Sequence, residues 1–492
     1  MNEGLSKELF TFAVKREEEV SEASGGYSST LKMLSCAFRR PLMIAPLTII
    51  ILILLFSLLL PLFIPRNADY LDPYYAKKGP RSSIMKSSLG VSMAETVRAL
   101  GEAGAISLAA IGLGAYDNSL TLQDTLGGEY MPIVSYSEAD GLYSLKVDTY
   151  LEVGFVYLAV SREEYEKMRL YEKETGIKLL YPLINNQDSK DRHNANLWYK
   201  TDGRGNPLNA LGEIAKFTPD MTLSDNYLRD ADGNPVYSIY TGGGNNESAG
   251  LRIRTLYYNY YRYKNGAPPD YLMGTDSQGY DLALRLAGGV RLSLGIALFV
   301  SLINLSLGAV IGAIEGYYGG AVDLVIERVR DIISGVPFIV VATLFQIHLG
   351  GKIGAIPSLL FAFVLTGWLS TASRMRAQFY RFKNSEYVLA ARTLGASDFR
   401  IITKHVFPNT LGTLITSSAL VIPRVIFSES MLSFLGIVNL GGEELTSLGT
   451  LLSEAGRVWT NFPHLILFPA LFVSLLMISF NIIGNLLREA LG

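Results

Sequence analysis

The sequence predicts a helical membrane protein with six spans and an inserted α+β domain. The chain of 492 residues is 49% hydrophobic and only 18% charged. Several of its windows lack any charged side chain over the roughly 20 residues that cross a hydrocarbon core. This composition excludes a soluble enzyme. The 43 basic and 45 acidic residues nearly cancel, so no overall basic field indicates a nucleic-acid partner.

The predicted spans are the six apolar runs that contain no Lys, Arg, Asp or Glu. The first run, Leu42–Ile64, follows Arg39 and Arg40. Because the polar and acidic segment 1–40 precedes this run and no small-residue cleavage site follows it, we expect a signal anchor that stays in the mature protein. The other five runs are Leu292–Ile314, Ile332–Gly351, Ile353–Ser373, Val406–Pro423 and Leu465–Leu487.

The short loops predict the orientation of these spans. With the N-terminus inside, the inner segments hold sixteen Lys and Arg residues and the short outer segments hold three. Because positive charge collects on the cytoplasmic side of a membrane protein, we expect both termini in the cytoplasm. The predicted organisation is a cytoplasmic segment 1–40, a first transmembrane helix 41–65, an inserted domain 66–270 outside the cytoplasm, and a helical core 271–492 with a cytoplasmic loop at 374–409.

The inserted domain is rich in tyrosine and has no disulfide to stabilise it. It holds 23 of the 28 tyrosines, between Asp69 and Asp281, and Cys36 is the only cysteine of the chain, so no intrachain disulfide or redox pair can form. Tyrosine suits a recognition surface, and it equally suits the packing of the domain's own core. Both interpretations apply to the cluster just before the second span, formed by Tyr257, Tyr258, Tyr260, Tyr261 and Tyr263.

Local patterns predict a mixed α+β fold for this domain. Small apolar residues at helical spacing predict a helix over Met93–Leu113, and a Ser-x-x-Glu capping box opens a charged helix over Ser161–Thr175. Leu145–Val160 and Val236–Tyr240 are typical of strands.

Arg374 to Asn409 reads RMRAQFYRFKNSEYVLAARTLGASDFRIITKHVFPN and resembles the coupling loop of ABC importer permeases. The family pattern is Glu-Ala-Ala, three residues, Gly, nine residues and Ile-x-Leu-Pro. Matching positions hold Ala390, Ala391, Gly395 and Pro408, while Leu389, His405 and Phe407 replace the Glu, Ile and Leu. We expect a short helix from Tyr387 to Leu394, ended by a left-handed Gly395, whose small alanines fit a groove on a partner protein. An ordinary basic loop is the alternative.

Met273 to Leu294 reads MGTDSQGYDLALRLAGGVRLSL and resembles the LGTDxxGRDxxSRxxxGxRxSL signature of the peptide-importer branch of these permeases. The matching residues are Gly274, Thr275, Asp276, Gly279, Asp281, Arg285, Gly288, Arg291, Ser293 and Leu294. We expect Thr275 or Asp276 to cap the following helix and Gly279 to permit a sharp turn into it. A purely structural role at the point where the chain enters the membrane is the alternative.

Three further stretches continue the resemblance in the same order. They are Glu315–Ala342, Glu429–Gly436 followed by Ser447–Gly449, and Phe480–Leu491. They are similar to the family's GYxGGxxDxxxMRxxDxxxxxP loop, its outer ExxLSFLG…SWG segment and its terminal FNxLGDxLRDxLDP. The resemblance covers the first helix and everything after Tyr271, and it leaves out the inserted domain.

The resemblance implies one transmembrane permease subunit of an ABC importer for peptides, in a bacterial cytoplasmic membrane. The implied partners are a second homologous permease, two ABC ATPase subunits and an extracytoplasmic peptide-binding protein, besides membrane lipid. Because no GxxxxGK[ST] loop occurs, ATP is expected on partner subunits, and we expect no catalysis, cofactor or metal in this chain. The alternatives are a membrane-anchored sensor, a permease for a non-peptide solute and a secondary transporter.

Three polar side chains are candidates for the translocation pathway. Gln346 and His348 lie near the outer end of the predicted third span, and Glu429 belongs to the outer motif. A polar residue within an apolar span indicates function by default. An interfacial position without a pathway role is the alternative for Gln346 and His348.

Overall fold

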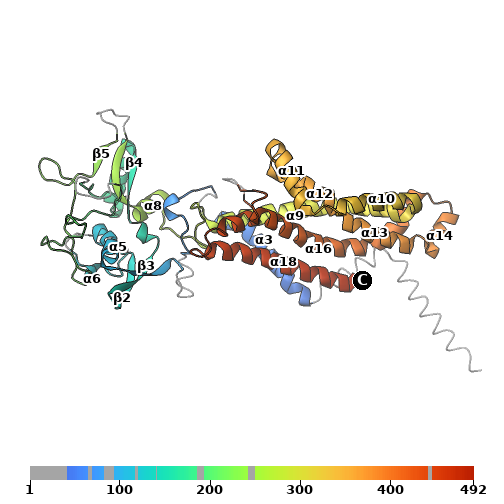
Figure 1. Cartoon of the computed structure of the whole chain (residues 1–492), viewed down its shortest axis with the longest axis horizontal. Coiled ribbons are helices and arrows are strands. Elements are labelled where there is room, and N and C mark those ends of the chain that lie inside the picture. Colours follow the sequence, from blue (N-terminus) through green and yellow to red (C-terminus); the bar gives the residue numbers. More distant parts are fainter. Residues whose placement is uncertain are drawn as a thin grey trace, which may run out of the picture. The chain divides into compact units, whose positions relative to one another are not determined.

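The computed structural model describes residues 41–64, 69–81, 93–116, 120–139, 141–185, 193–241, 250–441 and 446–491. The predicted cytoplasmic segment 1–40, with Cys36, lies outside the described residues. The chain divides into two compact units (Figure 1). The helical unit comprises Met1–Asp69 and Leu284–Gly492, and the inserted unit comprises Tyr70–Ala283.

Long apolar helices form the helical unit (Figure 1). Among the described residues, five stretches are long and apolar enough to cross a membrane, which confirms five of the predicted spans as apolar helices. They are α3 (Pro41–Phe63), α9 (Leu282–Tyr318), α12 (Ala355–Gly367) with α13 (Leu369–Phe382), α15 (Asp398–Arg400) through a π-helical turn (Ile401–Val406) into α16 (Phe407–Phe434), and α18 (His464–Leu491). A shorter helix, α17 (Leu448–Ala455), lies between α16 and α18 in the sequence.

The predicted third span, Ile332–Gly351, is wrong as a single helix. The chain forms α10 (Gly320–Ser334) and α11 (Phe338–Ile353), which meet at a bend of 76°. Pro337, directly before α11, has no backbone N–H and a fixed φ, so one helix stops and the next restarts after the proline. The pair is a broken span or a re-entrant loop, so the described residues contain five or six spans.

A stripe of three glycines on α9 lets α13 pack directly against its backbone. Gly308, Gly312 and Gly316 recur every four residues and therefore share one helix face. A Cβ atom added at these glycines would lie 2.6, 2.7 and 2.6 Å, respectively, from the Cβ atoms of Thr371, Met375 and Phe379. Small residues of this kind allow close helix packing inside a membrane, where the hydrophobic effect does not drive helices together.

The inserted unit is built on two three-stranded antiparallel sheets within its described residues. One sheet has the order β1-β3-β2 and the other β4-β6-β5. The strands are β1 (Glu95–Leu100), β2 (Ile133–Ala139), β3 (Leu142–Asp148), β4 (Phe155–Val160), β5 (Ser238–Tyr240) and β6 (Leu251–Leu256), and the helices are α5 (Glu102–Ala115), α6 (Leu122–Thr125), α7 (Arg162–Thr175) and α8 (Tyr257–Asn265).

The predicted local structure of the inserted unit is partly correct. The helix predicted over Met93–Leu113 is strand β1 up to Leu100 and helix α5 from Glu102, because Gly101 adopts an extended conformation between them. The strand predicted over Leu145–Val160 is two strands, interrupted by a turn in which Gly154 takes a φ of 67°.

Helix α7 begins as its capping box predicts, with one difference. The Ser161 hydroxyl accepts a hydrogen bond from the Glu164 N–H at 3.1 Å, as expected for an N-cap. The Glu164 carboxylate instead pairs with Lys264 of α8 at 2.5 Å. The box is therefore half formed, because the glutamate has a cationic partner on another helix.

Most of the clustered tyrosines pack the interior of the inserted unit. Tyr75 and Tyr271 are fully buried and Tyr261 is 1% exposed, all in one core cluster. The Tyr75 and Tyr257 rings meet at a centroid distance of 5.0 Å, and burial raises the pKa of Tyr75. Core packing accounts for Tyr257, Tyr258 and Tyr261, whereas Tyr260 and Tyr263 are only partly buried.

The two ends of the inserted unit are hydrogen-bonded to each other. Arg81 and Tyr271 form an antiparallel bridge, and the Lys77 N–H donates to the Asp276 carbonyl at 2.8 Å. Residues 271–281 were predicted in the core 271–492, but these bonds make them part of the inserted unit, which ends at Ala283. The predicted boundary at 270/271 therefore moves to 283/284.

Candidate functional site

The short helix predicted over Tyr387–Leu394 is present as α14 (Glu386–Thr393). It ends before Gly395, whose φ of 81° is left-handed as expected. The Ala396 N–H donates to the Ala391 carbonyl at 3.0 Å, a bond typical of a Schellman helix end. The predicted loop 374–409 is shorter than expected, because its first residues continue α13 to Phe382 and Pro408 lies in the first turn of α16.

The small residues of α14 lie on two different faces. Ala391 is only 8% exposed and Val388 is fully buried, so this face packs inside the helical unit. Val388 shares a core cluster with Tyr317 and Ile401. Ala390 and Gly395 are exposed. Ala390 and Gly395 therefore remain in the predicted contact surface, whereas Ala391 packs α14 against the rest of the helical unit.

The exposed residues of this segment include large apolar side chains, of which only Tyr387 was among the predicted coupling residues. Leu394 is 88% exposed and Phe399 is 77% exposed, with Leu389 and Tyr387 also exposed. We call Tyr387, Leu389, Leu394 and Phe399 the apolar coupling face. The sequence did contain a sign of this surface, because Leu394 and Phe399 flank Gly395 in an otherwise polar loop. An exposed apolar group of this kind marks a contact site for another protein.

Tyr317, at the end of α9, anchors the coupling loop. Its hydroxyl donates to the Asp398 carboxylate at 2.6 Å and accepts from Arg392 at 3.4 Å. Lys383 Nζ donates to the Gly316 carbonyl at 3.0 Å. A displacement of α14 would therefore act directly on the last turn of α9.

A buried ionic cluster joins α9, α10 and α13 at the same helix ends. Glu315 has a fully buried side chain whose Oε1 lies 2.8 Å from Arg330 Nη2 and 3.4 Å from Arg376 Nε. Arg376 also binds Asp323 through two bonds of 2.5 and 2.7 Å, and the Tyr380 hydroxyl donates to Asp323 at 2.6 Å. The sequence motif contained Glu315 and Asp323, but their partners on α13 come from a distant segment.

The signature before α9 closes a turn in the inserted unit. The Thr275 hydroxyl donates to the Tyr75 carbonyl and accepts from the Lys78 N–H, and the Asp276 carboxylate accepts from three backbone N–H groups of its own turn. Neither residue caps α9. Asp281 does so, accepting from the Ala283 N–H at 3.0 Å.

The glycines and arginines of this signature have separate roles. Gly274 and Gly279 have positive φ values of 82° and 109°, and an added Cβ at either would collide with backbone atoms of residues 72–80. Arg285 is 6% exposed. Arg291 donates to the Ser57 carbonyl at 3.1 Å and thereby joins α9 to α3.

The predicted pathway residues do not form one group. Glu429 is 1% exposed and accepts from Ser293 of α9 at 3.0 Å and from Ser433 at 3.1 Å, so it joins α9 to α16. Gln346 accepts from Ser358 of α12, and His348 is exposed on α11. Within the described residues, no group of three or more His, Cys, Asp or Glu side chains is suited to a metal ion.

Residues 305–492 match the model of a family described as binding-protein-dependent transport system inner membrane components. The dipeptide transport system permease protein DppC of Bacillus subtilis is 38% identical over 232 residues, which cover 46% of this chain and 69% of that protein. This chain belongs to the binding-protein-dependent transport permeases. The predicted family is confirmed, and the chain is a multi-pass membrane protein with a helical permease fold and an extra domain that contains strands.

Other members of the family give similar values. The oligopeptide permease OppC of Bacillus subtilis is 37% identical over 226 residues, 46% of this chain and 72% of that protein. OppC of Haemophilus influenzae is 38% identical over 221 residues, 45% and 70% of the two chains. A solved structure of the MetNI methionine ABC transporter, in an inward-facing conformation, matches with a TM-score of 0.34 and 15% identity over 42% of this chain and 96% of that chain.

Proposed function

We propose that this chain forms one transmembrane half of an ATP-driven importer for peptides and that a homologous permease forms the other half. The apolar coupling face, held on α9 through Tyr317, is the observation that carries the proposal. The sequence contains no phosphate-binding GxxxxGK[ST] loop, so ATP is bound and hydrolysed by two partner ATPase subunits. The names of the relatives, dipeptide and oligopeptide permeases, support a peptide substrate.

In this proposal the coupling loop and both termini face the cytoplasm of a bacterial cell. An ATPase receives α14 in a groove, and Tyr317 and the ionic cluster transmit its movement to α9, α10 and α13. The inserted unit faces outward, on the side from which a peptide-binding protein delivers the substrate. This chain moves the substrate and carries out no covalent chemistry.

The apolar coupling face provides the test. We expect Leu394→Asp and Phe399→Asp to reduce transport-coupled ATP hydrolysis at least about tenfold in liposomes that hold both permeases and both ATPases, because a carboxylate in a desolvated contact lacks a partner. Uptake of a labelled dipeptide should fall in parallel. Asn384→Asp is the matched control, since it adds the same charge to an exposed position beside this face. Full coupling in Leu394→Asp would refute the proposed contact.

Gly395 gives a second test of the same contact. Gly395→Asn keeps a residue that tolerates the left-handed φ, whereas Gly395→Trp adds a large side chain where an added Cβ would meet no atom within 4 Å. We expect coupling to survive the Asn variant and to be lost in the Trp variant, with equal amounts of both in the membrane. Equal coupling in the two variants would show that no partner surface lies close to Gly395.

A further inference from the structure

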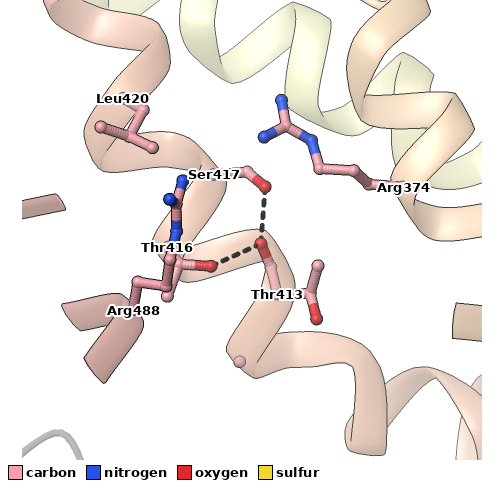
Figure 2. Close-up of a pocket in the computed structure, with 7 residues that line it drawn as sticks. Arg374, Thr413, Thr416, Ser417, Leu420 and Arg488 are labelled. Atoms are coloured by element: carbon pink, nitrogen blue, oxygen red, sulfur yellow. Dashed lines mark hydrogen bonds between the residues drawn. The ribbon is translucent and has the colours of Figure 1, made fainter. Parts of the chain in front are cut away.

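The helical unit contains a basic cavity that the proposed transport mechanism does not use. It has a volume of about 330 Å³ and is lined by residues of α13, α16 and α18 (Figure 2). Arg374 of α13 and Arg488 of α18 both extend toward α16. The lining, which contains no acidic side chain, consists of Arg374, Gly412, Thr413, Thr416, Ser417, Leu420 and Arg488.

The two arginines lack anionic partners within the described part of the chain. Arg374 donates to the Ser370 carbonyl at 3.2 Å and to the Ser370 hydroxyl at 3.3 Å, and both acceptors are neutral. Arg488, which lines the same cavity, carries the same charge. Because like charges near a low-dielectric interior repel each other, an anion between Arg374 and Arg488 would be strongly favoured.

The α16 side of the cavity supplies hydroxyl groups. Thr416 and Ser417 donate to the Thr413 carbonyl at 3.0 and 2.7 Å (Figure 2), and rotation about χ1 would turn either hydroxyl toward a ligand. Gly412 adds no side chain that would obstruct the approach. Two guanidinium groups with several hydroxyls match the oxygens of a phosphate, which accept charge-assisted and often bidentate hydrogen bonds.

The position of the cavity along the helices indicates where such a phosphate would come from. Arg374 lies two turns before the end of α13 at Phe382, and Arg488 lies in the last turn of α18. In the predicted topology these are the cytoplasmic ends of the two spans, where we expect lipid headgroups. Leu420 lies further along α16, in the direction of the apolar interior. Basic pockets between membrane helices at such a depth suit the headgroups of anionic lipids.

We propose that this cavity binds the phosphate of an anionic phospholipid. Arg374 and Arg488 hold the phosphate oxygens, the hydroxyls of Thr413, Thr416 and Ser417 complete the shell, and Leu420 contacts the start of an acyl chain. The site requires only the multi-pass helical fold of the chain. It therefore stands or fails independently of the proposed transport function.

Native mass spectrometry of the full-length chain in mild detergent tests the site, with phosphatidylglycerol or phosphatidylcholine added in equal amounts. We expect Arg374→Gln and Arg488→Gln each to weaken phosphatidylglycerol binding about tenfold, because each removes one charge-assisted contact. Phosphatidylcholine binding should not change. Arg381→Gln is the matched control, because Arg381 is an exposed arginine near the end of α13 and does not line the cavity. Thr413→Val, which keeps the charge and volume of the site, should weaken binding about threefold.

The other arms of the experiment separate the possible anions. If the chain retains phosphatidylglycerol and phosphatidylcholine equally, and inorganic phosphate binds in the cavity, the phosphate shell is correct but its ligand is a free anion. Displacement of phosphatidylglycerol by a dipeptide with a free C-terminus, and not by its C-terminal amide, would overturn the lipid proposal in favour of a substrate carboxylate. Unchanged phosphatidylglycerol binding in both arginine variants would overturn the site altogether.

Discussion

Two fully buried charges, one in each unit, are stabilised in different ways. In the inserted unit, Arg254 donates to the carbonyls of Ala195 and Pro182 at 2.8 and 3.2 Å and lies 3.8 Å from the centre of the Phe155 ring. Burial lowers the pKa of Arg254 to about 10. In the helical unit, Glu315 is instead held by the opposite charges of Arg330 and Arg376.

The difference shows what each unit has to hold together. Arg254 crosslinks two irregular segments of the inserted unit through their backbones, so it replaces the regular hydrogen bonds that those segments lack. Glu315 joins three helices whose backbones are already satisfied, so its ion pairs fix the helices relative to one another. The fully buried charge of the inserted unit therefore builds local structure, whereas the fully buried charge of the helical unit sets the arrangement of its helices.

The largest expected effect comes from breaking the ionic cluster. Glu315→Ala leaves Arg330 without its buried partner and should destabilise the helical unit by about 3–5 kcal/mol, the usual result of removing one side of a buried ion pair. Thermal unfolding of the purified chain in detergent measures this loss. Asp331→Ala, which removes an exposed partner of Arg328, is the control and should leave the unfolding temperature unchanged. Equal stability of the two variants would contradict the role assigned to Glu315.

A smaller loss is expected for the buried arginine of the inserted unit. Arg254→Met keeps the volume but leaves the Ala195 and Pro182 carbonyls without donors, which should lower the stability of the inserted unit by about 2–4 kcal/mol. Limited proteolysis of the full chain, followed at bonds within 193–241, reports that stability. Arg252→Met, on the same strand but more exposed, serves as the control. Resistance equal to that of the wild type would mean that Arg254 does not crosslink these segments.

A substitution in the glycine stripe of α9 tests the packing of α9 against α13 without changing the ionic cluster. Gly312→Val places a side chain where α13 already packs, so it should cost about 1–3 kcal/mol and displace α13 from α9. Crosslinking of cysteines introduced on α9 and α13, in a Cys36-free background, measures that displacement. Gly295→Ala is the control on the same helix, since an added Cβ there meets no atom within 4 Å. Undiminished crosslinking in Gly312→Val would contradict direct contact between these helices.

The smallest effect is a pH dependence in the inserted unit. The Lys264 ammonium beside Glu164 lowers the pKa of that carboxyl. A lowered folded-state pKa stabilises the fold above the unfolded value of about 4.3, and this contribution disappears as the pH falls through the lower folded value. Because the Glu164 side chain is partly exposed, the gain is below about 1 kcal/mol. The proteolytic stability gap between wild type and Glu164→Gln should be present at pH 7 and vanish near pH 3. A gap of equal size at both values would rule out this pair as its source.

The sequence predicted those parts of the fold that depend on local chemistry. Apolar runs defined five spans, the Ser161 cap defined the start of α7, and Gly395 defined the end of α14, because each of these features acts within a few residues. The break at Pro337 was missed, since the apolar run continues across it. The strand β1 was missed because its residues also fit a helix and only pairing with β3 selects the extended form.

The candidate site was predicted less completely for the same reason. The motif positions of the coupling loop were found, but which face of α14 is exposed depends on how α9 and α13 cover it. Ala391 and Ala390 are neighbours of one residue type, and only the packing of the folded unit makes one buried and the other exposed. Arg376, the centre of the ionic cluster, likewise belongs to no matched motif, and its role follows from the approach of α13 to α10.

The paired ends of the inserted unit bear on how this protein arose. A segment that leaves and rejoins its host at two neighbouring points can be inserted or removed as a unit, since the host chain needs only a short bridge in its place. The bonds between residues 72–81 and 271–281 form such a junction. A permease core could therefore carry or lack such a domain without any change in its membrane helices.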